Sequence, residues 1–130
     1  MRHHLLTLIL FCSLLLLLGC KSESEKNVLF EVLTHEKTGL DFNNKLVPTA
    51  ELNMFKYMYF YNGAGVGAGD LNNDGLIDLF FASNQSDNKL FLNKGNLQFT
   101  DITSQVKIPQ DKGWSTGVSL VDINNDGLLD

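Results

Sequence analysis

Two acidic nonapeptides carry the residues of this chain whose types and spacing are best suited to chemistry. The sequence DLNNDGLID occupies residues 70–78, and DINNDGLLD occupies residues 122–130. In the first copy, side-chain oxygens stand at alternate positions before Gly75 and again at the end of the loop. Ca²⁺ prefers about six to eight hard oxygen ligands, and glycine can take the positive φ that folds such a loop back. The predicted calcium ligands are Asp70, Asn72, Asp74, the Leu76 carbonyl and Asp78.

Other interpretations of this loop are less well matched to its residues. Zinc prefers His and Cys ligands, and neither nonapeptide contains one. Mg²⁺ remains an alternative, although it demands a stricter octahedron and keeps several waters. An EF-hand would have a bidentate Glu at position twelve and flanking helices, but Phe81 stands there and the flanks look like strands. A metal-free Asx turn is the structural alternative, and the presence of two copies in one register argues against it.

The two nonapeptides belong to a longer repeat. A shift of 52 residues aligns them and also brings Gly65 onto Gly117 and Val66 onto Val118. The sequence between the two copies has room for about four short strands. A four-strand unit of roughly 40–50 residues is the size of one propeller blade. The sequence therefore predicts about one full blade with flanking partial segments.

The segments around the loops have the composition of β-strands, and none shows a convincing helical period. Strands are expected at residues 28–33 and 54–61, where branched and aromatic residues gather. Residues 77–83 are apolar on both faces, which predicts a buried strand. Residues 89–93 and 97–103 are expected to form a hairpin across a glycine-containing turn. The alternating glycines Gly63, Gly65, Gly67 and Gly69 suit a closely packed strand near a propeller axis.

These residues carry a resemblance to a known family. GVGAGDLNNDGLIDLFFAS and GWSTGVSLVDINNDGLLD resemble the FG-GAP or VCBS-type repeats of integrin-like β-propellers. NKLFLNKGNLQFTDIT, between them, is similar to the linking stretch of bacterial proteins of the cartilage-acidic-protein and ASPIC/UnbV type. The resemblance runs from about Tyr57 to Asp130, and more weakly from Val28. The Phe-Gly and Gly-Ala-Pro signature that gives FG-GAP repeats their name is not intact, and GAGVGAG stands in that region. This departure favours the VCBS-like subgroup.

The resemblance implies an all-β fold, a β-propeller whose blades have four antiparallel strands, with calcium in the turn between the first two strands of a blade. It carries the ligand set over to the second loop. Propellers close with about four to eight blades, and residues 28–130 supply fewer than two. We therefore expect an N-terminal fragment of a longer protein. The implied ligands of the second loop are Asp122, Asn124, Asp126, the Leu128 carbonyl and Asp130.

The N-terminal segment predicts a lipid anchor. A short basic start is followed by about fourteen mostly apolar residues, which is too short for a membrane span and typical of a secretion signal. The run ends in LLGC, which resembles the bacterial lipobox. Residues 1–19 are thus a predicted signal peptide, Cys20 the lipidated residue, and residues 20–27 its flexible tether. The resemblance to bacterial lipoproteins implies, from Lys21 after the cysteine, an outer-membrane lipoprotein that faces the periplasm or the cell surface.

Composition and motifs limit the classes of function that this chain could have. The net charge of −5, with scattered basic residues, argues against a nucleic-acid partner. The leading hypothesis is a calcium-binding, membrane-anchored module without enzymatic activity that binds a glycan, a protein or a matrix outside the cytoplasm. The alternative is the N-terminal part of a propeller enzyme, a hydrolase or lyase of polysaccharides or other substrates, whose active site lies outside this fragment. A third hypothesis is a spacer or scaffold at the outer membrane.

Aromatic residues cluster in the middle of the chain and return once near its end. Stacking against carbohydrate is one interpretation, and packing in the core, favoured by their strand-like spacing, is the other. The residues concerned are Phe55, Tyr57, Tyr59, Phe60, Tyr61 and Trp114. Asn84, Gln85 and Ser86 fit a glycosylation sequon, which we interpret as a chance match.

Overall fold

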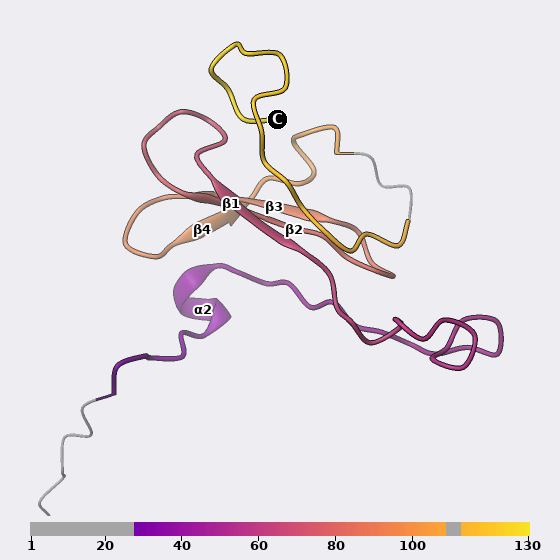
Figure 1. Ribbon diagram of the computed structural model, residues 1–130. Helices are drawn as coiled ribbons and strands as arrows, with labels where there is room; N and C mark the ends of the chain where they lie inside the picture. The colour runs from indigo at the N-terminus through magenta and orange to yellow at the C-terminus, as the bar shows by residue number, and fades with distance from the viewer. Residues whose placement is uncertain (1–27, 109–112) are drawn as a thin grey trace, which may run out of the picture. The chain divides into compact units, whose positions relative to one another are not determined.

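The computed structural model describes residues 28–108 and 113–130. The predicted signal peptide, Cys20 and the tether lie outside the described residues. Val32–Asp130 forms one compact unit. Its elements are α2 (His35–Thr38), β1 (Val66–Gly69), β2 (Asp78–Phe81), β3 (Lys89–Asn93) and β4 (Phe99–Asp101) (Figure 1). No helix within the described residues is long and apolar enough to cross a membrane.

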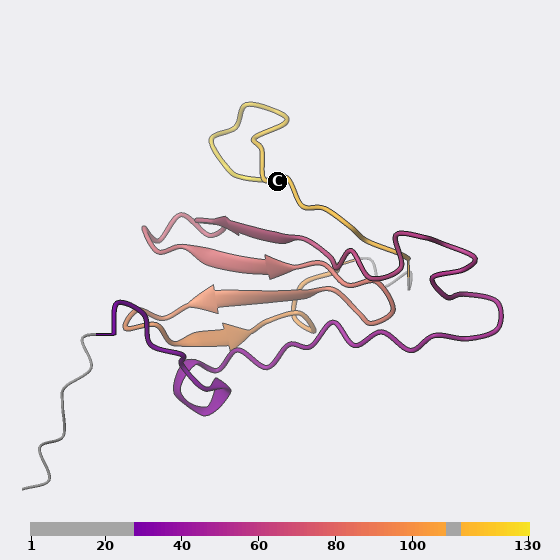
Figure 2. The ribbon, with the colours of Figure 1, turned by 60° about the horizontal axis from the view of Figure 1, so that its bottom comes forward.

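The four strands form one antiparallel sheet in the order β1-β2-β3-β4. Figure 2 shows them side by side, each connected to the next along the chain. The register pairs Gly67 with Phe80 and Leu79 with Phe91. In the last pair of strands, Phe91 lies opposite Asp101. The predicted all-β class is confirmed, and the sheet has the four-strand order expected of one blade.

The two strands in the middle of the sheet hold its core. Phe91 on β3 and Phe60 are both fully buried, at 0% exposure. Ala82, directly after β2, is also buried. The hairpin predicted from residues 89–103 is present, and its turn uses Gly95 with φ 79° and Asn96 with φ 52°. Burial of Phe91 and Ala82, together with the half-buried apolar side chains of β2, therefore holds the sheet that positions the first acidic loop.

Different segments cover the two faces of the sheet. On one face, Phe42 stacks on Phe81 with ring centroids 4.8 Å apart. On the other, a Cβ added to Gly65 would lie 2.8 Å from Gly117, and one added to Gly67 would lie 2.6 Å from the Val118 side chain. The predicted close packing is therefore present at Gly65, Gly67 and Gly69, whereas a Cβ added to Gly63 would meet nothing within 4 Å. The glycines of β1 allow the corresponding stretch of the second repeat to approach this closely.

Two of the predicted strands are wrong. Residues 28–33 have no strand partner, and residues 54–61 form successive turns. In the second segment, Lys56 and Tyr57 donate their N–H groups to the Asn53 carbonyl, at 3.0 and 2.8 Å. Asn53 Oδ1 also accepts the N–H of Phe55 at 3.0 Å. Local hydrogen bonds of an asparagine compete with a strand ladder, and here they replace it.

One helical turn also departs from the expectation that helix is absent. Thr34 O accepts the N–H groups of Lys37 and Thr38, both at 3.1 Å, which closes α2. Gly39, at φ 76°, ends the turn in the left-handed conformation that glycine adopts readily. The element is too short to produce a helical period in the sequence.

Candidate metal centre

The first acidic loop, residues 70–78, connects β1 to β2 at one end of the sheet. Its side chains fold the loop by accepting backbone N–H groups. Asp70 accepts the N–H of Asp74 on Oδ1 at 3.1 Å and that of Gly75 on Oδ2 at 2.8 Å. Asn72 Oδ1 also accepts the Asp74 N–H, at 3.1 Å. Asp74 Oδ1 accepts the N–H of Leu76 at 2.9 Å. These contacts draw positions one, three and five toward the same backbone turn.

The last predicted ligand of this loop has a different environment. Asp78 is fully buried at the start of β2. Its Oδ2 accepts the Leu71 N–H at 3.0 Å, and its Oδ1 accepts the Asn93 N–H from β3 at 2.8 Å. Asp78 therefore joins the loop to the sheet, because the same carboxylate binds both backbones.

The second loop reproduces the internal contacts of the first. Asp122 accepts the N–H groups of Asp126 and Gly127 at 3.0 and 2.8 Å. Asp126 Oδ1 accepts the Leu128 N–H at 2.9 Å. Asp130 Oδ2 accepts the Ile123 N–H at 3.1 Å, as Asp78 does from Leu71. The remaining matched contacts are those of the asparagine at position three, Asn124, with Asp126.

Both loops also share two residues with positive φ. Gly75 and Gly127 have φ values of 83° and 88°, as expected for the glycine that turns the loop. Asn73 and Asn125 have φ values of 57° and 59°, which the sequence analysis did not predict. Asparagine enters the left-handed region more readily than most residues. The repeated Asn-Asn pair was the signal that could have indicated this position.

The donor chemistry of both loops fits Ca²⁺. Each loop offers carboxylate, amide and carbonyl oxygens, which are ligands that calcium prefers, and no nitrogen or sulfur ligand that zinc would need. The carboxylate oxygens of Asp70 each accept one N–H and have a second lone pair for a cation. Among residues 28–108 and 113–130, groups of three or more His, Cys, Asp or Glu side chains do not converge on a preformed metal site.

The electrostatics of the first loop favour an ionised carboxylate at its centre. The backbone N–H of Leu76 and the Asn72 side chain lower the pKa of Asp74, and Lys94 adds to this, against a small opposing effect of desolvation. Hydrogen bonds to the charged form stabilise it. Asp74 is therefore anionic at neutral pH, in the form that a cation requires.

A buried polar cluster lies at the far end of β2 from the first loop. Asn84 is 2% exposed, and its Oδ1 accepts the Asn44 amide at 2.7 Å. Its Nδ2 donates to the Ser115 carbonyl at 2.9 Å. Ser83, also buried, donates its hydroxyl to Asn44 Oδ1 at 3.2 Å. Both ends of the Asn84 amide are thus used inside the protein, which agrees with the interpretation of the sequon as a chance match.

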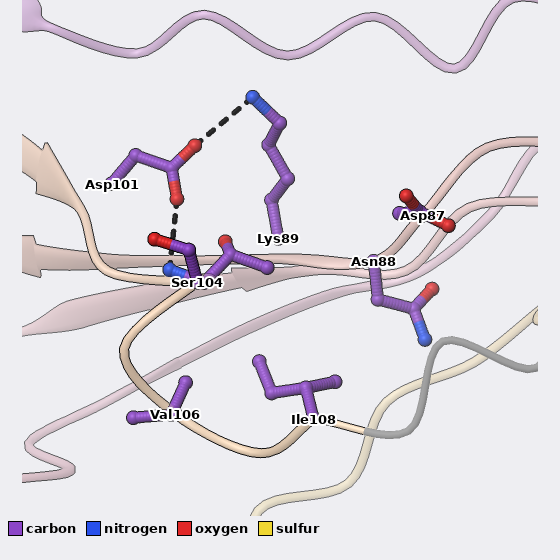
Figure 3. A pocket seen from close by; sticks show the side chains of 8 residues that line it. Asp87, Asn88, Lys89, Asp101, Ser104, Val106 and Ile108 are labelled. Carbon is purple, nitrogen blue, oxygen red and sulfur yellow. Dashed lines mark hydrogen bonds and ion pairs between the residues drawn. The ribbon is translucent and has the colours of Figure 1, made fainter.

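An open hollow of about 640 Å³ lies beside β3 and β4 (Figure 3). Asp101 and Lys89 form an ion pair at 3.0 Å on its wall. Asp101 also accepts the Thr103 N–H at 2.9 Å, so its carboxylate is held in place. Asp87 lies at the opposite side of the hollow in Figure 3. The sequence showed no motif around Asp87 and Asp101, because they are distant in the chain. The β3–β4 hairpin and the turn that follows it bring them to one hollow.

The predicted aromatic core is only partly present. Phe60 is fully buried, whereas Phe55 is 92% exposed. Tyr59 and Tyr61 are also exposed. Tyr57 and Trp114 are half-buried and meet edge to face, with ring centroids 5.5 Å apart. The reason is the turn structure of residues 54–61, which removes the period-two alternation that would have placed these rings on one face.

Comparison with known proteins confirms the resemblance. Residues 70–130 match the FG-GAP-like repeat family. Cartilage acidic protein 1 of Xenopus tropicalis is 36% identical over 81 residues, and that of Mus musculus is 32% identical over 81 residues. In both cases the alignment covers 62% of this chain and 12% of the relative. The matched part of this chain therefore spans about an eighth of the length of these relatives. No solved structure matches the chain.

Proposed function

We propose that this chain, which carries FG-GAP-like repeats, is a calcium-binding, lipid-anchored β-propeller module that binds a glycan, protein or matrix ligand outside the cytoplasm. The match to FG-GAP-like repeats suggests an extracellular ligand-binding module rather than an enzyme. The observation that carries the calcium proposal is the agreement of the two loops. Each internal side-chain hydrogen bond of residues 70–78 has a counterpart in residues 122–130.

Ca²⁺ would have a structural role in both loops. Each loop concentrates three aspartates in nine residues, and their mutual repulsion is relieved by a divalent cation. Asp70, Asn72, Asp74, the Leu76 carbonyl and Asp78 would hold the ion in the first loop, with the corresponding residues in the second. Bound calcium would fix the turn between β1 and β2 and so stabilise the edge of the sheet. The ligand-binding surface would then be rigid.

The lipid anchor rests on residues 1–20. LLGC at the end of the apolar run supports attachment of acyl chains to Cys20, and two or three chains on one residue suffice for stable anchoring. Labelling of the expressed protein with a radioactive fatty acid tests this, and Cys20→Ser is expected to abolish the label. Cys12→Ser is the matched control, and it should label like the wild type.

The metal proposal is tested by calorimetric titration of residues 21–130 with Ca²⁺, together with thermal melting in Ca²⁺ and in EDTA. Two bound ions and a higher melting temperature in Ca²⁺ are expected. Asp74→Ala should remove one ion and reduce the calcium-dependent rise. A folded chain that binds no calcium and melts at the same temperature in EDTA would contradict the proposal and leave both nonapeptides as metal-free Asx turns.

A further inference from the structure

Asn93, the last residue of β3, lies beside the end of the first acidic loop. The register pairs Leu79 of β2 with Phe91 of β3. Two residues further along β3, where the two strands separate, Asn93 stands opposite Ile77. On its other side Asn93 pairs with Phe99 of β4. Asn93 is therefore placed to contact both the loop and the β3–β4 hairpin.

Asn93 joins the loop to the hairpin by three hydrogen bonds. Its backbone N–H donates to Asp78 Oδ1 at 2.8 Å, and its side-chain Nδ2 donates to the Ile77 carbonyl at 2.9 Å. Its Oδ1 accepts the N–H of Gly95 at 2.8 Å, inside the hairpin turn. Both ends of the Asn93 amide are thus used, one for the loop and one for the turn.

These contacts restrain Asp78, the last predicted calcium ligand of the first loop. Asp78 is fully buried, and its second carboxylate oxygen accepts the Leu71 N–H at 3.0 Å. A carboxylate with an N–H on each oxygen keeps one orientation, and each oxygen retains a lone pair for a cation. The Asn93 side chain also holds the Ile77 carbonyl, which belongs to the peptide unit that leads into Asp78. It therefore restrains the backbone from which this carboxylate extends.

Partners that orient a metal ligand contribute to affinity without contact with the metal. A carboxylate that is already held in place loses less conformational freedom when the ion binds. Loss of such an outer hydrogen bond typically lowers metal affinity by about 10–100-fold. Asn93 makes contacts of this kind, although it lies outside both nonapeptides.

We propose that Asn93 is a positioning residue of the first calcium site, which orients Asp78 by holding the Ile77 carbonyl. This inference rests on the proposed function, because it concerns calcium binding by residues 70–78. It goes beyond that function by placing a determinant of calcium affinity in the β3–β4 hairpin. Calcium in the first loop would in turn stabilise the hairpin turn, because coupling between two parts of a protein is reciprocal.

The test treats the two loops separately, so that the second loop serves as the reference. The full chain, in a neutral detergent, is titrated with calcium chloride in a calorimeter, with Asp126→Ala to isolate the first site or Asp74→Ala to isolate the second. Asn93→Ala is expected to weaken calcium binding at the first site about tenfold and to leave the second site unchanged. Gln98→Ala, at an exposed residue of the same hairpin turn, is the matched control and should change neither affinity.

A second variant, Asn93→Ser, separates the orientation of Asp78 from the formation of the hairpin turn. A serine hydroxyl can accept the Gly95 N–H in place of the asparagine oxygen, but it is too short to hold the Ile77 carbonyl. The turn should therefore form even if Asn93→Ala does not fold. Asn93→Ser is expected to weaken binding at the first site as Asn93→Ala does. Unchanged affinity in Asn93→Ser would assign Asn93 to the turn alone and overturn the proposal.

Amide hydrogen exchange in EDTA gives a readout that needs no metal. Substitution of Asn93 is expected to reduce the protection of the Leu71 N–H, which Asp78 accepts, and to leave that of the corresponding Ile123 N–H unchanged. Unchanged Leu71 protection, unchanged calcium affinity at the first site, or equal weakening at both sites overturns this inference alone. A folded wild-type chain that binds no calcium overturns the proposed metal function, and this inference with it.

Discussion

The two acidic loops have nearly the same sequence and the same internal hydrogen bonds, but they differ in their surroundings. Asp78 is fully buried and binds the Asn93 N–H of β3. Asp130, its counterpart, is exposed, although its backbone pairs with Val121 as Asp78 does with Gly69. The comparison teaches that the nonapeptide determines the loop conformation by itself, whereas the contact of Asp78 with β3 joins the first loop to the sheet.

The largest expected difference between the loops is at their last aspartate. Asp78→Ala removes the acceptor of two N–H groups, those of Leu71 and Asn93. Unmet buried donors destabilise by about 1–3 kcal/mol each, so we expect a loss of about 2–6 kcal/mol in the free energy of unfolding. Asp130→Ala should have a much smaller effect, because Asp130 is exposed. Urea denaturation in EDTA measures both, and equal losses would contradict the comparison.

The next effect concerns the glycines that precede the loops. A Cβ on Gly65 would lie 2.8 Å from the backbone of Gly117, which cannot move aside as a side chain can. Gly65→Ala should therefore separate the second repeat from β1 and destabilise by about 1–3 kcal/mol. Gly117→Ala, at the corresponding position, meets nothing within 4 Å and should be nearly neutral. Limited proteolysis of residues 113–130 in each variant reports the separation directly, and greater cleavage is expected for Gly65→Ala alone.

A smaller effect should be the same in both loops. Gly75 and Gly127 have almost equal positive φ values, and an alanine in this conformation costs about 1–2 kcal/mol. Gly75→Ala and Gly127→Ala should each weaken calcium binding at one site by about tenfold in calorimetric titration, the equivalent of that cost. Leu76→Ala is the matched control, because it keeps the proposed carbonyl ligand and should leave the affinity unchanged. Loss at only one of the two glycines would show that the loops are not equivalent.

The contrast between local and distant effects also explains what the sequence could predict. The loops, the glycine turn and the β3–β4 hairpin depend on residues close in the chain, and all three were found where the spacing placed them. The binding of Asp78 to Asn93 depends on the register of β2 and β3, which no local pattern contains. The turns at residues 54–61 were missed because hydrogen bonds of Asn53 override the aromatic alternation. The same turns place Tyr57 against Trp114, a contact between distant parts of the chain that no local pattern contains.

The smallest expected effect lies outside both loops, in the pair Asp101 and Lys89. Burial alone would raise the pKa of Asp101, but hydrogen bonds from Thr103 and the nearby Lys89 outweigh it and lower the pKa below its usual 3.8. Because the folded pKa is the lower one, this stabilisation is present above about pH 4 and is lost as the pH falls through the folded pKa. Asp101→Asn should destabilise by about 0.5 kcal/mol at pH 7, since partly exposed pairs are screened. Urea denaturation of wild type and variant between about pH 7 and 2.5 should show the two converging in acid, and a difference that persists there would mean that hydrogen bonding, not charge, holds the β3–β4 edge.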